Sequence, residues 1–282
     1  MLSRLILVHG RTRYLSISEF ILYFFYKNFV LTMPQFFFAY MCGFSATSFF
    51  DDFYINLYNA FFTAVAPCGL GIYYWDVYPD LDETALLPDS KNLMLSSRRG
   101  LLLSSKNPPP INMNGILTKL YSVGQLRRKF NAKTFFKMQL QAFYDSVIIF
   151  FIPFYGAMWS SQITNGETGS VADMWTVSIT AFTALIFIIH TNILLRFRHI
   201  TIVHMAMVLI GGLLSYFSYM WIGNFPEFSQ TRFAVLEAHE TPIFYLTVAC
   251  CIACSSMADF ALQAYTTLFQ CSPTDYLRIT MS

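Results

Sequence analysis

Long stretches of the chain contain apolar residues and almost no charge, and this feature limits the folds open to it most strongly. A transmembrane helix needs about 20 mostly apolar residues to cross the roughly 30 Å hydrocarbon core of a bilayer. Six segments reach this length, at residues 17–47, 53–75, 138–160, 174–195, 200–222 and 241–264. Only 12% of all residues are charged, whereas soluble domains usually carry about 25%. The sequence therefore predicts an all-α membrane protein, a bundle of six transmembrane helices.

The placement of lysine and arginine predicts that both termini are cytosolic, because cytoplasmic loops of membrane proteins are enriched in these residues. In that orientation, all of the 18 lysines and arginines except Lys27 and Arg232 lie in the cytosolic stub, loops and tail. The outer loops, which include 161–173 and 223–240, carry acidic residues instead. These are Asp51, Asp52, Glu167, Asp173, Glu227, Glu237 and Glu240.

The same boundaries predict five parts along the chain. They are a cytosolic stub (1–16), a first transmembrane hairpin (17–75), a basic cytosolic loop (76–137), a four-helix transmembrane region (138–264) and a cytosolic tail (265–282). Within the loop, residues 90–115 are rich in Ser, Asn, Pro and basic residues, which is typical of a flexible insertion.

Two local signals concern the first helix, which is longer than a bilayer requires. Ser16 and Glu19 have the spacing of a capping box, so the helix is expected to begin there. Pro34 falls inside the helix and predicts a kink, because proline lacks a backbone N–H and its ring crowds the preceding turn.

The sequence contains no motif for binding a nucleotide or for activating water. The patterns GxxxxGK[ST], GxSxG and HExxH are absent, and the five histidines are isolated from one another. Cys251 and Cys254 form a CxxC, but no second pair completes a zinc site. We therefore expect no catalytic residue, no metal site and no nucleic-acid partner in this chain.

Polar residues inside the apolar segments are the candidates for function, because burying them in a membrane is costly. Lys27 is the strongest candidate; the alternative is that its long stem carries the ammonium to the cytosolic interface. Asn28 beside it cannot reach the interface and suggests a hydrophilic interior. Asn59 and Thr63 are four residues apart and are expected to line the same interior; a lone hydrogen bond between helices is the alternative.

Two acidic residues inside the apolar segments receive a simpler interpretation. Asp145 and Asp259 lie nearer the predicted cytosolic ends of their segments. Hydrogen bonding at the interface explains both of them adequately. We therefore expect neither carboxylate to take part in the substrate path.

Several strings resemble the phospholipid flippases, the lipid-transporting class of P-type ATPases. "RLILVHGRTRYLSISEFILYFFYKNF" (4–29) resembles the family's approach to its fifth membrane helix, and "CGFSATSFFDDFYINLYNAFFTAVAPCGLGIYYWD" (42–76) its fifth-to-sixth helix hairpin. "LYSVGQLRRKFNAKTFF" (120–136), "YDSVIIFFIPFYG" (144–156) and "SPTDYLRI" (272–279) are similar to later parts. In the family, the lysine and asparagine of YKN lie beside the route of the lipid headgroup. The resemblance therefore implies that Lys27 and Asn28 are substrate-path residues.

The chain departs from the family pattern in two respects. Tyr74 and Trp75 stand where the family usually has the first two residues of an acidic DQD, and only Asp76 remains. The family's first four helices, its actuator and nucleotide-binding domains and its phosphate-accepting DKTG aspartate have no counterpart in the sequence. The resemblance thus covers the carboxy-terminal six-helix half, and this chain is expected to hold no cofactor. ATP and magnesium would belong to the catalytic domains.

The resemblance implies the membrane part of an ATP-driven translocase that moves aminophospholipid-type lipids toward the cytosolic leaflet. An inactive membrane subunit that regulates an intact flippase is the alternative, and an unrelated passive channel or scramblase is a third. The expected partners are membrane phospholipid, an accessory glycoprotein subunit and a separate chain that carries the catalytic domains. The expected location is the plasma membrane or the Golgi and endosomal membranes.

Overall fold

The computed structural model describes residues 10–73, 130–160, 173–197, 201–222 and 234–269. The backbone divides into two compact units, Met1–Leu15 with Trp75–Lys129, and Ser16–Tyr74 with Phe130–Ser282. The described part of the first unit is only the start of one helix, so the architecture below is that of the second. Most of the predicted basic loop, 76–137, falls outside the described residues.

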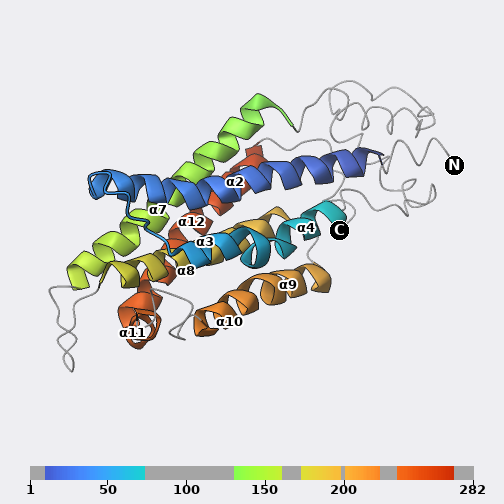
Figure 1. The fold of residues 1–282 in the computed structure, drawn as a ribbon. Helices are drawn as coiled ribbons and strands as arrows, with labels where there is room; N and C mark the ends of the chain where they lie inside the picture. The colour runs from blue at the N-terminus through green and yellow to red at the C-terminus, as the bar shows by residue number, and fades with distance from the viewer. Residues whose placement is uncertain (1–9, 74–129, 161–172, 198–200, 223–233, 270–282) are drawn as a thin grey trace, which may run out of the picture. The chain divides into compact units, whose positions relative to one another are not determined.

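Every regular element in the described ranges is a helix, which confirms the all-α prediction for this part of the chain. Figure 1 shows their arrangement: α3 and α4 lie between α2 on one side and α9 and α10 on the other. The helices are α2 (Arg11–Met41), α3 (Asp52–Leu57), η2 (Tyr58–Phe62), α4 (Val65–Tyr73), α7 (Ala132–Ser160), α8 (Met174–Arg196), α9 (Ile202–Val208), η3 (Leu209–Leu214), α10 (Ser215–Ile222), α11 (Ala234–Glu240) and α12 (Pro242–Phe269).

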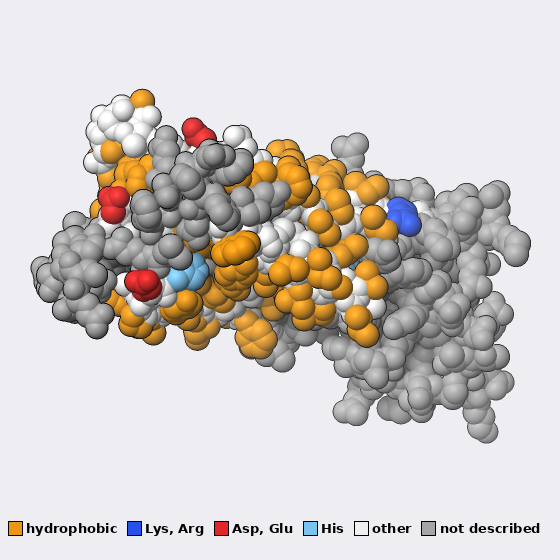
Figure 2. Space-filling model, turned by 60° about the horizontal axis from the view of Figure 1, so that its bottom comes forward, with side chains coloured by type: hydrophobic (Ala, Val, Ile, Leu, Met, Phe, Trp, Pro, Cys, Tyr) orange, Lys and Arg blue, Asp and Glu red, His pale blue; other side chains and the backbone are white. Residues whose placement is uncertain are grey.

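Four described helices are long and apolar enough to cross a membrane, and they correspond to four of the six predicted segments. Figure 2 shows that hydrophobic side chains dominate the described surface on the face drawn. The remaining two segments correspond to α2 and to a shorter apolar helix at Ile202–Ser218. Their crossing of the membrane stays a prediction. The four spans are Asp52–Ile72, Ala132–Gly156, Met174–Arg196 and Pro242–Leu262.

Helix α2 begins earlier than the sequence predicts. It starts at Arg11, so Ser16 lies inside the helix and the predicted capping box is wrong. The Ser16 hydroxyl instead donates to the carbonyls of Leu70 and Gly71, at 2.9 and 2.6 Å. These carbonyls belong to the last turn of α4, where the helix offers them no partner of its own. Helix α2 continues through Pro34 without a break.

Helix α8 forms the centre of the bundle. It packs against α4, α7, α9, α11 and α12, and nearly every side chain from Ser178 to Ile193 is buried. A helix that is apolar on all sides is expected to be enclosed in this way. The Phe182 ring lies 5.3–6.2 Å, between centroids, from five other rings, so the core is largely aromatic. The five are Phe50, Tyr54, Tyr58, Phe62 and Tyr216.

Two helical segments contain π-turns, and these turns contact one another. Tyr58–Phe62 interrupts the helix that begins at Asp52, and Leu209–Leu214 lies between α9 and α10. The Val65 side chain abuts Gly211 so closely that a Cβ at position 211 would lie 2.5 Å from the Val65 Cβ. Glycine is therefore required for the two segments to approach. Such π-turns occur frequently at functional sites.

Candidate functional site

Lys27 lies inside the helical bundle and is only 2% exposed. Its Nζ donates to the Thr63 hydroxyl at 2.9 Å and to the Thr63 carbonyl at 3.2 Å. The rings of Phe24 and Tyr58 lie 5.2 and 5.8 Å from Nζ, within the range of cation–π attraction. The structure thus holds the ammonium against the interior of the helix pair and gives no support to the alternative of an interfacial position.

The Thr63 carbonyl is free to accept this bond because of Pro67. In a regular helix, the N–H of residue 67 would donate to the carbonyl of residue 63, but proline has no N–H and its ring crowds that carbonyl. The backbone at Thr63 leaves the helical conformation, with φ −128° and ψ 12°, and α4 begins again at Val65. A lysine ammonium therefore satisfies a carbonyl that the helix itself leaves without a partner.

The π-turn places two residues of the second segment against Lys27. Tyr58 OH donates to the Lys27 carbonyl at 2.7 Å, and the Thr63 hydroxyl donates to the Tyr58 carbonyl at 2.6 Å. Tyr58 and Thr63 are five residues apart, and the Thr63 N–H also donates to the Tyr58 carbonyl at 3.0 Å. These two bonds hold Thr63 against the start of the π-turn. Lys27, Tyr58 and Thr63 therefore form one connected cluster, the Lys27 site.

The structure treats the four predicted site residues differently. It brings Lys27 and Thr63 together, and it leaves Asn28 half-buried next to them, with no side-chain hydrogen bond among the described residues. Asn59, in contrast, is exposed, although Thr63 is buried. The structure does not place Asn59 in the interior that Thr63 faces. The backbone leaves the helical conformation at Thr63, so the i, i+4 relation of an α-helix does not hold between the two residues.

Asp145 forms a buried junction of four helices that was not predicted from the sequence. Its side chain is 0% exposed. Its carboxylate accepts hydrogen bonds from Tyr26 OH of α2 at 2.6 Å, from Ser255 Oγ of α12 at 2.7 Å and from Asn192 Nδ2 of α8 at 3.3 Å. Asn192 Nδ2 also donates to Tyr26 OH. We call this set the Asp145 layer; it corrects the expectation that Asp145 lies at the interface.

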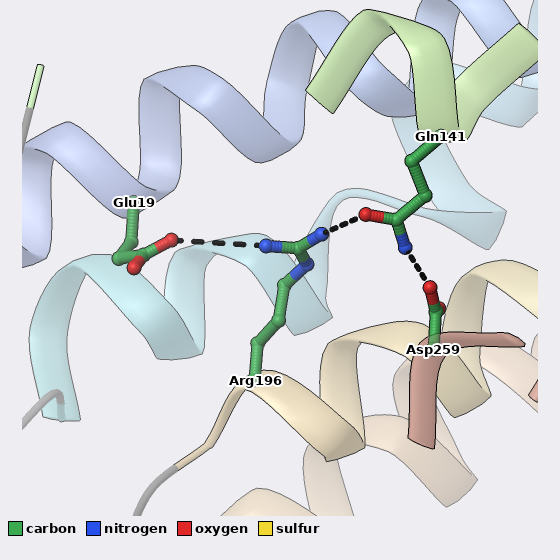
Figure 3. A network of polar contacts seen from close by, with 4 residues as sticks. All are labelled: Glu19, Gln141, Arg196 and Asp259. Atoms are coloured by element: carbon green, nitrogen blue, oxygen red, sulfur yellow. Dashed lines mark hydrogen bonds and ion pairs between the residues drawn. The ribbon is translucent and has the colours of Figure 1, made fainter. Parts of the chain in front are cut away.

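A second layer of polar contacts, drawn in Figure 3, lies one helical turn from the first along α7, α8 and α12. Arg196 Nη2 donates to Gln141 Oε1 at 3.2 Å, and Arg196 Nη1 lies 3.9 Å from Glu19 Oε2. Gln141 Nε2 in turn donates to Asp259. This Arg196 layer joins α2, α7, α8 and α12, the same four helices as the Asp145 layer.

The free hydrogen-bonding capacity of the Lys27 site indicates what it can bind. An ammonium has three N–H donors, and Thr63 accepts from only two of them. No described carboxylate lies within ion-pair distance of Lys27. No acceptor among the described residues engages the third donor, which leaves it for an anionic or strongly dipolar group that enters the membrane interior. Among the described residues, no group of three or more His, Cys, Asp or Glu side chains is arranged to hold a metal ion.

Comparison with known proteins gives a consistent result. Residues 1–88 and 112–272 match the family described as phospholipid-translocating P-type ATPase, C-terminal. The chain is 32% identical to phospholipid-transporting ATPase ID from Mus musculus, over 88% of this chain and 18% of that protein. The Homo sapiens protein of the same name gives the same identity and coverage. Phospholipid-transporting ATPase IC from Xenopus tropicalis is 30% identical, over 93% of this chain and 19% of that protein. The chain thus spans less than a fifth of the length of these curated relatives.

Proposed function

The chain belongs to the phospholipid-translocating P-type ATPase family, through its C-terminal region, and we propose from this that it forms part of the transmembrane transport domain of an ATP-driven phospholipid translocase. The proposed substrates are aminophospholipid-type lipids that move toward the cytosolic leaflet. In this proposal Lys27 and Thr63 lie on the path of the headgroup, and Asn28 lies at its side. Asn59 has the weakest support, because it faces outward.

The buried ammonium of Lys27 is the observation that carries this proposal. A charge inside a bilayer is costly and usually marks a substrate or ion pathway. The one N–H of Lys27 that Thr63 does not engage can donate to a lipid phosphate or carboxylate, and charge-assisted bonds of this kind are among the strongest hydrogen bonds. The acyl chains of the same lipid would remain in the hydrocarbon during the crossing.

The order of residues in the two polar layers supports the proposed topology. From the Arg196 layer to the Asp145 layer, residue numbers rise in α2 and α7 and fall in α8 and α12. Helices α8 and α12 therefore run opposite to α2 and α7. This alternation agrees with six crossings and with both termini on one side, which we propose is the cytosolic side, in the plasma membrane or in Golgi or endosomal membranes.

The catalytic parts and partners of such a translocase are proposed to lie outside these 282 residues. ATP and magnesium would bind catalytic domains on a separate chain or elsewhere in the complete protein. An accessory glycoprotein is proposed to contact the outer loops. Those loops, 161–173 and 223–240, fall largely outside the described residues.

An inactive membrane subunit that regulates an intact translocase is the second candidate. The observation that favours it is the sequence Tyr74–Trp75, which replaces two residues of an otherwise acidic motif. A regulator of this kind needs no headgroup contact at Lys27. Binding of lipid at Lys27 therefore distinguishes the two functions.

The test compares lipid binding by the purified 282-residue chain and by its Lys27→Met variant in detergent. Short-chain phosphatidylserine is the probe, and short-chain diacylglycerol, which has the acyl chains but no phosphate, is the control ligand. Losing one hydrogen bond to a charged group should weaken phosphatidylserine binding about tenfold to hundredfold. Diacylglycerol binding should not change.

Stability is measured in parallel, with Lys137→Met as the matched control because Lys137 is exposed on α7. Removing Lys27 relieves the burial of a charge but leaves the Thr63 carbonyl without a donor, so the two effects should largely offset each other. If Lys27→Met destabilises the chain while phosphatidylserine binding is unchanged, the lysine is structural and the proposal fails.

A further inference from the structure

We propose that Asp145 is a positioning residue for the Lys27 site: through Tyr26 it fixes the rotation of α2 that directs Lys27 toward Thr63. This inference builds on the proposed function, because it concerns the same lysine. It rests on the hydrogen bonds of two consecutive residues of α2: Tyr26 bonds to Asp145, and Lys27 bonds to Thr63.

Tyr26 and Lys27 are adjacent in the sequence, so their side chains leave α2 about 100° apart, as 3.6 residues per turn requires. Tyr26 points to Asp145 of α7, and Lys27 points to Thr63 beside α4. Rotation of α2 that lengthened one contact would also displace the other. The direction of Lys27 is therefore determined in part by the bond that Tyr26 makes.

The Asp145 end of this connection is held firmly. Tyr26, Asn192 and Ser255 each donate to the carboxylate from a different helix, and all four residues of the Asp145 layer are almost completely buried. Three donors from three helices therefore converge on one carboxyl group. Asp145 thus holds α2 in register with three helices, and among the described residues Tyr26 makes the hydrogen bond from α2.

A general structural role would not require a carboxylate. Well-packed apolar residues often stabilise a protein as much as a buried charged group does, or more. What the carboxylate adds is direction, because each of its bonds is satisfied in only one arrangement of the four helices. Because Tyr26 is next to Lys27 in the sequence, this fixed arrangement also sets the direction of the Lys27 side chain.

Tyr26→Phe is the main test variant, because it removes one hydroxyl and keeps the ring. Tyr216→Phe is the matched control. Tyr216 is also a buried tyrosine, but it lies on α10, and its hydroxyl hydrogen bonds with Thr183 of α8 at 2.7 Å. Each change is made in the full 282-residue chain, with Lys27 present and in the Lys27→Met background. Binding of short-chain phosphatidylserine and the unfolding midpoint are measured for all of them.

If Tyr26 acts through Lys27, Tyr26→Phe should weaken phosphatidylserine binding about threefold to thirtyfold when Lys27 is present and leave it unchanged in the Lys27→Met background. Tyr216→Phe should leave binding unchanged in both. Equal losses in both backgrounds would show a merely structural role and overturn the inference. Asp145→Asn provides a second variant, and its effect should not add to that of Tyr26→Phe.

The unfolding data separate failure of this inference from failure of the proposed function. If Lys27→Met does not alter phosphatidylserine binding, the proposed function fails, but the unfolding midpoints still form a double-mutant cycle between positions 26 and 27. Non-additive shifts would support positioning of Lys27 by Tyr26. Additive shifts would overturn it.

Discussion

Gly212→Ala should destabilise the protein strongly, because the space for a Cβ at this position is already filled. An ideal Cβ on Gly212 would lie 1.8 Å from His190 Nε2 and 2.5 Å from His190 Cδ2. His190 is 2% exposed, and its Nδ1–H donates a hydrogen bond to the Ile186 carbonyl at 2.7 Å. Moving the ring away from a Cβ at position 212 would therefore break or distort that hydrogen bond.

The magnitude follows from these two effects. Overpacking a tight core costs about 1–3 kcal/mol, and losing the ring hydrogen bond adds about 0.5–1.5 kcal/mol. The free energy of unfolding should therefore fall by about 2–4 kcal/mol. It can be measured by titrating the detergent-solubilised chain with sodium dodecyl sulfate and following helix content by circular dichroism.

Gly156→Ala is the matched control, because a Cβ there would meet only Thr247 atoms, at 3.4 and 3.7 Å. That distance is ordinary van der Waals contact, and alanine favours a helix over glycine by about 1 kcal/mol. Gly156→Ala should therefore be neutral or stabilising. His190→Ala should relieve the clash of Gly212→Ala, so the two changes should be strongly non-additive. If Gly212→Ala unfolds at the same midpoint as the unmodified chain, the packing argument is refuted.

Two further predictions follow from the sequence and from the Lys27 site. Pro67→Ala supplies the missing N–H, so the Thr63 carbonyl should accept the regular helical hydrogen bond from residue 67. The free energy of unfolding should rise by about 1–2 kcal/mol, and phosphatidylserine binding should weaken in the assay used for Lys27→Met. A loss of stability would contradict this account of Thr63. The purified chain alone should neither hydrolyse ATP nor form a phosphoenzyme, because the sequence has no DKTG and no phosphate-binding loop; vanadate-sensitive ATPase activity of this polypeptide would contradict that expectation.

Sequence reasoning found the helical class and singled out Lys27, which the structure shows to be buried, because both depend on local composition. Apolar windows of about 20 residues predict helices whatever their neighbours, and a lysine inside such a window is conspicuous wherever it packs. The hydrogen-bond partner of Lys27 was harder to predict from the sequence. Thr63 was named as a candidate, but the reason it can accept from Lys27 lies in Pro67, four residues later, whose effect on the Thr63 carbonyl follows from elementary backbone geometry.

The same proline marks the stretch where the prediction for Asn59 failed. The i, i+4 rule holds for a continuous α-helix, whereas Tyr58–Phe62 is a π-helix and the backbone leaves the helical conformation at Thr63. A proline with a polar residue four positions before it, inside an apolar segment, is a warning that the helix does not continue regularly. Tyr58 and Thr63, rather than Asn59 and Thr63, are the pair that faces Lys27.

The two polar layers show what single-segment reasoning overlooks. Gln141 and Asp145, Asn192 and Arg196, and Ser255 and Asp259 are three pairs of polar residues, each four apart and each on a different helix. One polar residue near a helix end is explained by the interface, but two on one helical face require a polar surface to meet. Three helices with such polar faces can satisfy their hydrogen bonds by packing these faces against one another. Glu19 and Tyr26 then extend the two layers to α2, seven residues apart on that helix. Tyr26 brings the Asp145 layer to the residue next to Lys27.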